Sequence, residues 1–217
     1  MAGIGTVRIA YKDPVLWSSL ASFKKRPAER IRNEDLSRYA LKHVTLENLR
    51  RSNIVFSFNR AGIAECQPTS DSNAYRDEIL FSSRGDDVST NAGPCSSYIL
   101  FCEKTRIAAA AHVASSHLKD RLFHKDMLLY AYASLRQMAP KNPISAYISG
   151  MEFILGADFR TIRPFMKKHY RIILLSALEE LMGRGVRIIS IDIGDPYSQQ
   201  VFSPMTGEYK TFLSLFK

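Results

Sequence analysis

A thiol and an imidazole stand close together in this sequence, at Cys95 and His112. An unassisted cysteine has a pKa of about 8.5, so at neutral pH it needs a neighbouring base to take its proton before it attacks. A histidine within hydrogen-bond reach supplies that base, and a third polar group usually holds the ring. Thr90 and Ser89 are the nearby candidates for the third group, and Gly93 permits backbone conformations that aim amide N–H groups at a developing oxyanion.

Two β-prone segments must position this pair. Residues 98–101 read Tyr-Ile-Leu-Phe, a charged turn follows, and a second apolar run stops at His112. A two-residue turn at Glu103-Lys104, or a four-residue loop from Cys102 to Thr105, would place Cys95 directly opposite His112 on one face of a hairpin. A three-residue loop would send the two side chains to opposite faces, and the alanine run 108–111 is also compatible with a helix. From spacing alone, a structural cysteine and a core histidine are the commoner explanation.

The segment around the cysteine resembles a known family. Residues 90–95, Thr-Asn-Ala-Gly-Pro-Cys, with His112 seventeen residues on, are similar to the T-x-x-G-S-C…H signature of the CheD family of chemoreceptor glutamine deamidases. The cytotoxic necrotizing factor toxins, which deamidate a glutamine of small GTPases, share this arrangement. The resemblance implies that Cys95 is the nucleophile, that His112 is the base and that Thr90 orients it.

Two later segments agree with the same family in order and distance. Residues 148–153, Ile-Ser-Gly-Met-Glu-Phe, resemble its strand with a Gly-rich end and a Met-Phe pair, and residues 192–208 resemble its D-V-G-G…R-x-V-x-F…T-G-E ending. The similarity covers about residues 86–212. Pro94 replaces the family's serine, Asp195 its second glycine, and residues 198–199, Ser-Gln, its Gly-Arg pair. These departures bear on the substrate more than on the chemistry, because they fall at the predicted rim of the site.

The resemblance also implies a fold and an activity. The expected fold is α/β, a three-layer α/β/β sandwich of mixed sheets with two helices packed on one side. The expected activity is cofactor-free conversion of a protein's glutamine side chain to glutamate, with release of ammonia, by a chemotaxis deamidase or by a bacterial effector or toxin. A catalytically inactive, CheD-like module that binds proteins is the alternative.

Charge is concentrated at the front of the chain. The net charge is +9, and residues 1–60 hold twelve Lys or Arg against five Asp or Glu. Docking to an acidic protein or an anionic membrane surface explains this excess better than nucleic-acid binding, because no nucleic-acid motif accompanies it. With no apolar run of about 20 residues and no secretory signal, we expect a cytoplasmic protein or one exported without a classical signal peptide.

The order of elements predicts two regions. Residues 1–78 read as a basic, mainly helical N-terminal extension that ends in a polar loop at 59–78, and residues 79–217 as the catalytic domain. In the second region, a strand at 79–82 is followed by a turn-rich run at 89–94, by strands at 98–101 and 107–112, and by helices at about 124–139 and 164–183. Further strands are predicted at 144–148, 186–193, 199–203 and 208–213. This order requires at least a mixed sheet packed against two helices.

Other chemistry is not indicated by the sequence. The remaining histidines, including the rival base His117, do not stand at metal-ligand spacing with acidic residues or with the three cysteines. No glycine-rich phosphate loop is present. The three cysteines, Cys66, Cys95 and Cys102, do not make a disulfide framework. So few cysteines, in an odd number, are typical of a protein in a reducing compartment.

Overall fold

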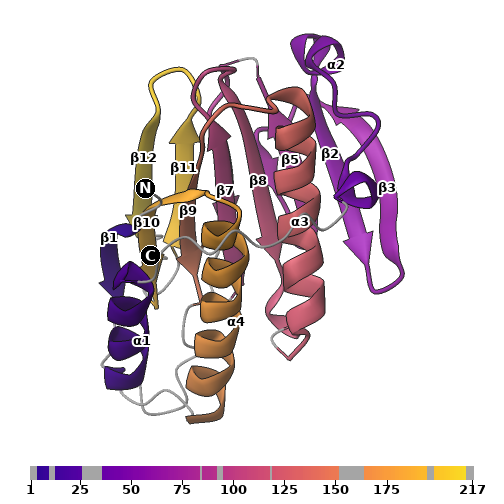
Figure 1. Ribbon diagram of the computed structural model, residues 1–217. Coiled ribbons are helices and arrows are strands. Elements are labelled where there is room, and N and C mark those ends of the chain that lie inside the picture. The colour runs from indigo at the N-terminus through magenta and orange to yellow at the C-terminus, as the bar shows by residue number, and fades with distance from the viewer. Residues whose placement is uncertain are drawn as a thin grey trace.

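The computed structural model describes residues 4–9, 13–25, 36–83, 85–91, 95–117, 119–151, 164–194 and 198–213. Within these residues the predicted mixed α/β class is confirmed, with four α-helices and two mixed sheets of eight and four strands (Figure 1). The helices are α1 (Pro14–Lys25), α2 (Leu46–Arg51), α3 (Arg121–Met138) and α4 (Pro164–Gly183), and two 3-10 turns are η1 (Ser37–Tyr39) and η2 (Ser115–His117). None of the described helices combines the length and the apolar character needed to cross a membrane.

The large sheet runs parallel at one side and antiparallel elsewhere. Its strands, in spatial order, are β1 (Ile4–Ile9), β10 (Arg187–Ile193), β9 (Ile144–Gly150), β7 (Ser96–Cys102), β8 (Ile107–Val113), β5 (Glu78–Ser82), β2 (Asn53–Asn59) and β3 (Gly62–Thr69). Strands β1, β10 and β9 are parallel, and α4 provides the long connection that two parallel neighbours need. The small sheet has the order β12 (Glu208–Leu213), β11 (Ser198–Ser203), β6 (Val88–Asn91) and β4 (Asn73–Ala74).

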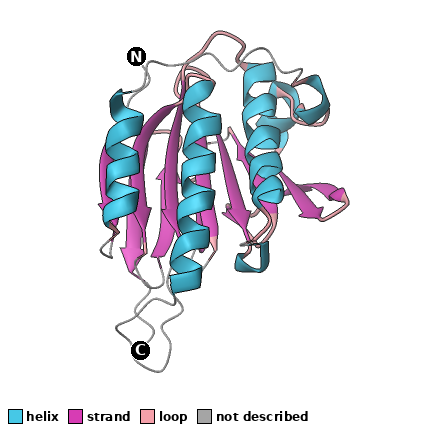
Figure 2. Cartoon of the chain, turned by 60° about the horizontal axis from the view of Figure 1, so that its bottom comes forward, coloured by secondary structure: helices cyan, strands magenta, loops and turns pink. Residues whose placement is uncertain are grey.

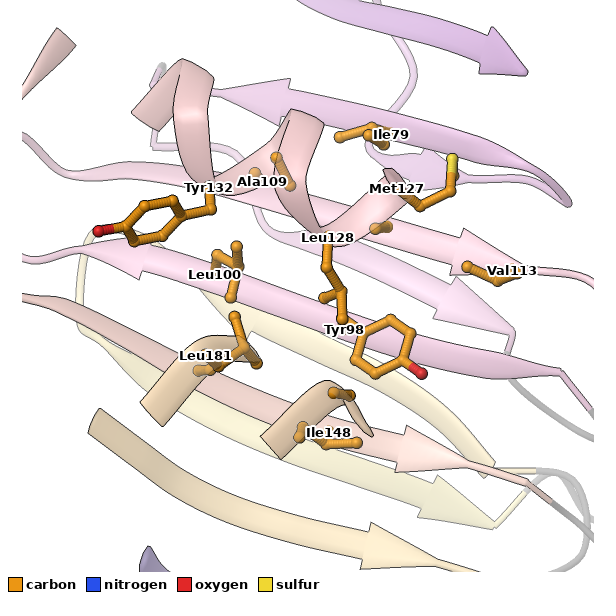
Figure 3. Close-up of a cluster of buried hydrophobic side chains, with 14 of the residues drawn as sticks. Ile79, Tyr98, Leu100, Ala109, Val113, Met127, Leu128, Tyr132, Ile148 and Leu181 are labelled. Atoms are coloured by element: carbon orange, nitrogen blue, oxygen red, sulfur yellow. The ribbon is translucent and has the colours of Figure 1, made fainter. Parts of the chain in front are cut away.

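Helices α1, α3 and α4 lie on one face of the large sheet (Figures 1 and 2). The prediction placed only two helices there, and α1 from the N-terminal region is the third. Leu16 and Leu20 of α1 belong to the same buried cluster as Leu174 and Leu178 of α4. Figure 3 shows Leu128 and Leu181, from α3 and α4, close to Leu100 of β7.

The small sheet packs on the opposite face of the large one. Val88 and Phe202 of the small sheet share a buried cluster with Ile99, Phe101 and Ala110 of β7 and β8. Both central strands are therefore covered on both faces, and their even and odd residues point to different layers. The alanine run in β8 is strand, since β5 and β7 bind it on both sides.

Two stretches that read as loops from sequence are strands. Residues 59–78, predicted as a polar loop, form most of the β2–β3 hairpin and all of β4, and residues 88–91 form β6 in place of a turn. The prediction was wrong because β3 is exposed along most of its length, so no alternation of apolar residues marks it. Backbone pairing with β2 defines the strand instead.

The N-terminal region completes the large sheet. Its described part supplies β1 at one edge, β2 and β3 at the other, and α1 to the shared core. Residues 4–78 therefore have no separate core among the described residues, and they hold strands as well as helices. A functional boundary at residue 78 stays a prediction.

Two adjacent residues of α1 test this shared core. Leu16 is fully buried and Val15 is 56% exposed. We expect Leu16→Ala to lower the free energy of unfolding by about 2–5 kcal/mol through the cavity it leaves. The matched Val15→Ala change should stay within about 0.5 kcal/mol.

Urea unfolding gives the measurement. Trp17 is the only tryptophan and lies in α1, so its fluorescence follows that helix while far-ultraviolet circular dichroism follows the whole chain. Coincident transitions are expected for one cooperative unit. An early fluorescence transition separated from the dichroism change would show that α1 unfolds by itself.

Candidate active site

A row of polar side chains crosses five strands of the large sheet. Cross-strand pairing aligns Asp192, Ser149, Ser97, His112 and Glu78, one on each of five adjacent strands. Directly paired residues project from the same face, and this face is the one that meets the small sheet. We call these five residues the polar row. It lies near the end of the sheet at which β9 and β10 finish and β7 begins, which is the lower end in Figure 1.

Both outer members of the polar row are held by neighbours. Arg8 donates from Nε and a terminal nitrogen to the two carboxylate oxygens of Asp192, both at 2.8 Å. Glu78 accepts from the Ser57 hydroxyl at 3.2 Å and from the Tyr75 amide at 2.9 Å. The ends of the row are therefore fixed, and its middle is left to the contact with the small sheet.

The predicted register of the β7–β8 hairpin was wrong by two residues. Ser97, and not Cys95, lies directly opposite His112. The connection is a four-residue loop at 103–106, closed by Arg106 in the left-handed region with φ 56°. Cys95 stands one residue before β7, in a bend, and no residue of β8 pairs with it. The shift is even, so the alternation of β7 carried back to residue 95 would place Cys95 on the face of His112 as its diagonal neighbour, and diagonal pairs within a sheet are about 7–8 Å apart.

His112 is held as a neutral base. Its Nδ1 lies 3.0 Å from the main-chain oxygen of Ala74, and a carbonyl only accepts, so the ring proton sits on Nδ1. The other nitrogen, Nε2, is buried and has no hydrogen-bond partner among the described residues. Burial lowers the pKa of His112, while the Ala74 carbonyl and Asp77 act against that shift. The arrangement leaves a bare acceptor nitrogen for a proton.

Thr90 does not hold the imidazole. Its hydroxyl lies 2.5 Å from the Ser97 hydroxyl, which in turn donates to Oε1 of Gln200 at 3.2 Å. The predicted role of Thr90 is taken by the carbonyl of Ala74, its neighbour in the β4–β6 pairing. Ser89, the other candidate, bonds to Asn73 at 3.1 Å. No signal in the sequence marks Ala74 for this role, because every residue has a main-chain carbonyl.

Cys95 is buried and kept neutral. It is 3% exposed, and its carbonyl accepts from the Met151 amide at 2.7 Å. Burial raises the pKa of the Cys95 thiol; hydrogen bonds from Ser115 and the charge of Arg76 oppose the shift, and Asp77 adds to it. A thiol with a raised pKa and a histidine with a lowered pKa are both neutral at pH 7.

The segments that carry the three sequence motifs meet here. Gly150, the last residue of β9, and Met151, the residue after it, have φ of 86° and 54° and bring the Met151 amide to the Cys95 carbonyl. Gly194 donates from its amide to the Gly150 carbonyl at 2.9 Å. Gly93, predicted at the oxyanion, lies outside the described residues, as do Pro94, Asp195 and the Glu-Phe pair at 152–153.

The rival base, His117, is engaged elsewhere. Its Nε2 lies 3.2 Å from Oδ2 of Asp77, and its ring stacks on Phe123 of α3 with centroids 4.0 Å apart. Asp77 also donates from its amide to the His112 carbonyl at 2.7 Å and accepts from the Ala114 amide at 2.9 Å. This bracing of the end of β8 was not predicted. The described residues contain no group of side chains suited to hold a metal ion.

Comparison with known proteins adds little. No protein-family model matches the chain, and no curated protein matches it. Among solved structures, it is similar to the Neisseria meningitidis protein NMB0706, of the family model DUF152, with 14% sequence identity and a TM-score of 0.29. That match covers 54% of this chain and 52% of the other, and a TM-score this low does not indicate a shared fold.

The state of His112 is directly measurable. We expect its ring to remain neutral, with the proton on Nδ1, at pH 6.5, where the histidine of an unfolded chain is about half protonated. Below about pH 6.5 the unfolded chain binds more protons at this histidine than the folded chain does, because the folded pKa is lowered. The stability that the neutral ring contributes above this pH is therefore lost as the pH falls, and the free energy of unfolding decreases.

Long-range ¹H–¹⁵N correlation spectra of the imidazole nitrogens report both tautomer and titration. The signals of His112 are assigned by their absence in His112→Gln. A proton on Nε2, or a titration midpoint above 6.5, would contradict the geometry described for this ring.

Proposed function

We propose that the protein is a cysteine-dependent amidohydrolase that acts on a glutamine side chain of another protein, similar to the CheD family of deamidases. The observation that carries the proposal is the state of His112. Its Nδ1–H is committed to the Ala74 carbonyl, and its Nε2 has no partner among the described residues. An acceptor nitrogen of this kind is what a general base for the Cys95 thiol needs, and Cys95 comes two residues before Ser97, the residue opposite His112.

The chemistry needs no group beyond the chain and water. Nε2 of His112 takes the Sγ proton as sulfur bonds to the carboxamide carbon, and the imidazolium returns that proton to the departing ammonia. Water then attacks the thioester, His112 accepts its proton, and the carbon–sulfur bond breaks to give glutamate and the free thiol. Neutral partners suit this sequence, because the proton moves only as the bond to carbon forms.

Two features of the fold support the family resemblance. The segments that carry the three motifs come together at one end of the large sheet, through the bonds of Met151 with Cys95 and of Gly194 with Gly150. The helical layer, the large sheet and the small sheet follow one another in the order that a three-layer α/β/β sandwich requires. Both features are expected if the site is that of a CheD-like enzyme.

The departures from the family motif favour a partner other than a chemotaxis receptor. Ser198-Gln199 stands where the family has Gly-Arg, and the chain carries a basic N-terminal region. An acidic surface on the substrate, or an anionic membrane beside it, would attract this positive charge. Nucleic acid is not proposed as a partner, because no nucleic-acid-binding motif accompanies the charge in the sequence. We propose an effector-like deamidase whose substrate is a protein.

Loss of the thiol should abolish the reaction. Candidate partner proteins incubated with the wild type should gain about one dalton at a single glutamine, because an amide becomes an acid. Cys95→Ala and His112→Gln should lower the rate by at least about a hundredfold. Cys66→Ala is the matched control, since that thiol is exposed on β3, and it should retain full activity. Intact-mass analysis with peptide mapping gives the measurement, and an active Cys95→Ala protein would refute the proposal.

A second candidate is a binding module that keeps the fold without the activity. The burial of Cys95 and its raised pKa favour this alternative, because a protonated thiol reacts slowly. The two candidates differ in whether His112 assists the sulfur.

Alkylation by iodoacetamide separates them without any substrate. In the enzyme, His112→Gln should slow alkylation of Cys95 at pH 7 about tenfold or more, because the base is gone. At pH values above the thiol pKa the two proteins should react alike, since the thiolate is already formed. Equal rates at both pH values would favour the binding module. Mass mapping of the Cys95 peptide excludes signal from Cys66.

A further inference from the structure

Two facing rows join the sheets behind the site. In the small sheet, pairing aligns Ala74, Thr90 and Gln200 on β4, β6 and β11. These three residues meet His112 and Ser97, the middle of the polar row, through the Ala74 carbonyl, the Thr90 hydroxyl and the Gln200 amide oxygen. We call these five residues the inter-sheet seam. It is the polar part of an interface that is otherwise apolar.

The direction of each bond in the inter-sheet seam is fixed by chemistry. Oε1 of Gln200 only accepts, so the Ser97 hydroxyl donates its single proton there. The Ser97 oxygen must then accept from Thr90. The hydrogen bonds therefore run in one direction, from Thr90 to Ser97 and from Ser97 to Gln200. Without Gln200, the hydroxyl proton of Ser97 would lose this acceptor.

Gln200 is well placed to control the site from a distance. Its side chain is fully buried and accepts a hydrogen bond from Ser97 of β7. Ser97 lies opposite His112 in the β7–β8 pairing and follows Cys95 by two residues in the chain. Gln199, the residue before it on β11, pairs with Asn91 and Phe212 and is partly exposed. Neighbouring residues of a strand point to opposite faces, so only Gln200 faces the seam.

We propose that Gln200 is a positioning residue: through Ser97 it holds β7 in place, so that the Cys95 thiol and Nε2 of His112 meet in the geometry that proton transfer requires. The inference rests on the proposed function for its consequence in catalysis. A misplacement of about 1 Å can cost two orders of magnitude in rate, so a bond from a third strand is enough to matter. Gln200 itself does not touch the reacting atoms.

The pH profile of Cys95 alkylation tests this role. Gln200→Met keeps the volume but removes the acceptor, and we expect the rate at pH 7 to fall about tenfold, toward that of His112→Gln, with the rate above the thiol pKa unchanged. Gln67→Met, the matched control on the exposed strand β3, should follow the wild-type profile. A merely structural defect acts in the other direction, because a loosened fold exposes Cys95 and speeds alkylation at every pH.

The path through Ser97 is tested by a double-mutant cycle. Ser97→Ala removes the same bond from its other end, so it should give a similar loss at pH 7, and the Ser97→Ala/Gln200→Met double variant should lose no more than either single one. If Gln200→Met does not fold, Ser97→Ala carries the test alone. Additive losses, or a Gln200→Met profile equal to that of Gln67→Met, would overturn the inference.

The two proposals fail in different ways. Deamidation by Cys95→Ala would refute the proposed function, whatever the alkylation profiles show. Loss of deamidation in Cys95→Ala, combined with wild-type alkylation in Gln200→Met and Ser97→Ala, would refute only the role of Gln200.

Discussion

The hydrogen bond from Nδ1 of His112 to the Ala74 carbonyl is the interaction on which the site depends. A carbonyl accepts and never donates, so this bond selects one tautomer and leaves Nε2 bare. It also joins the two sheets, because His112 stands on β8 and Ala74 on β4. The state of the base is therefore set by sheet packing, and any motion that separated the sheets would release the ring. A side-chain carboxylate in the same place would also have held the ring, but its negative charge would have raised the pKa of the imidazole.

This bond lies in a small polar region within an apolar interface. Most of the contact between the sheets is made by residues such as Phe101, Ala110 and Phe202. At the inter-sheet seam the buried hydroxyls of Thr90 and Ser97 need partners, since an unpaired buried polar group costs about 1–3 kcal/mol. Two polar atoms of the inter-sheet seam still lack a partner among the described residues, Nε2 of His112 and Nε2 of Gln200. The first of these is the atom to which we assign the proton transfer.

Electrostatics separates the two histidines at the end of β8. His112 is buried between the sheets, which lowers its pKa, and it bonds only to a neutral carbonyl. His117 lies against Asp77 and α3, where its Nε2 is bonded to a carboxylate oxygen and its ring stacks on Phe123. The first environment keeps a base neutral and available, and the second turns a histidine into a structural link. Burial of Cys95 completes the neutral pair, since a thiolate would be poorly solvated there.

The sequence by itself determined the elements whose apolar pattern repeats within one segment. Such local patterns predict strands β7 and β8, helices α3 and α4 and the mixed α/β class. Residue types and spacing likewise single out Cys95 and His112 as a candidate nucleophile and base. It could also be predicted that an even-numbered loop keeps the alternation of the two strands in phase, as the four-residue loop does. Their exact register could not, since it depends on Arg106 adopting a left-handed conformation that its residue type does not signal.

Only the tertiary structure decided what lies between the sheets. Strands β3 and β6 have too few apolar residues to be marked as strands, and they form because β2 and β11 offer them backbone partners. The same holds for the N-terminal region, whose place at both edges of the large sheet no local pattern reveals. Ala74 received its role because its carbonyl, which every residue possesses, was brought to His112 by the packing of one sheet on the other. A hydrogen bond from a main-chain atom leaves no trace in residue type, so the sequence names the nucleophile and the base, while the fold supplies what orients them.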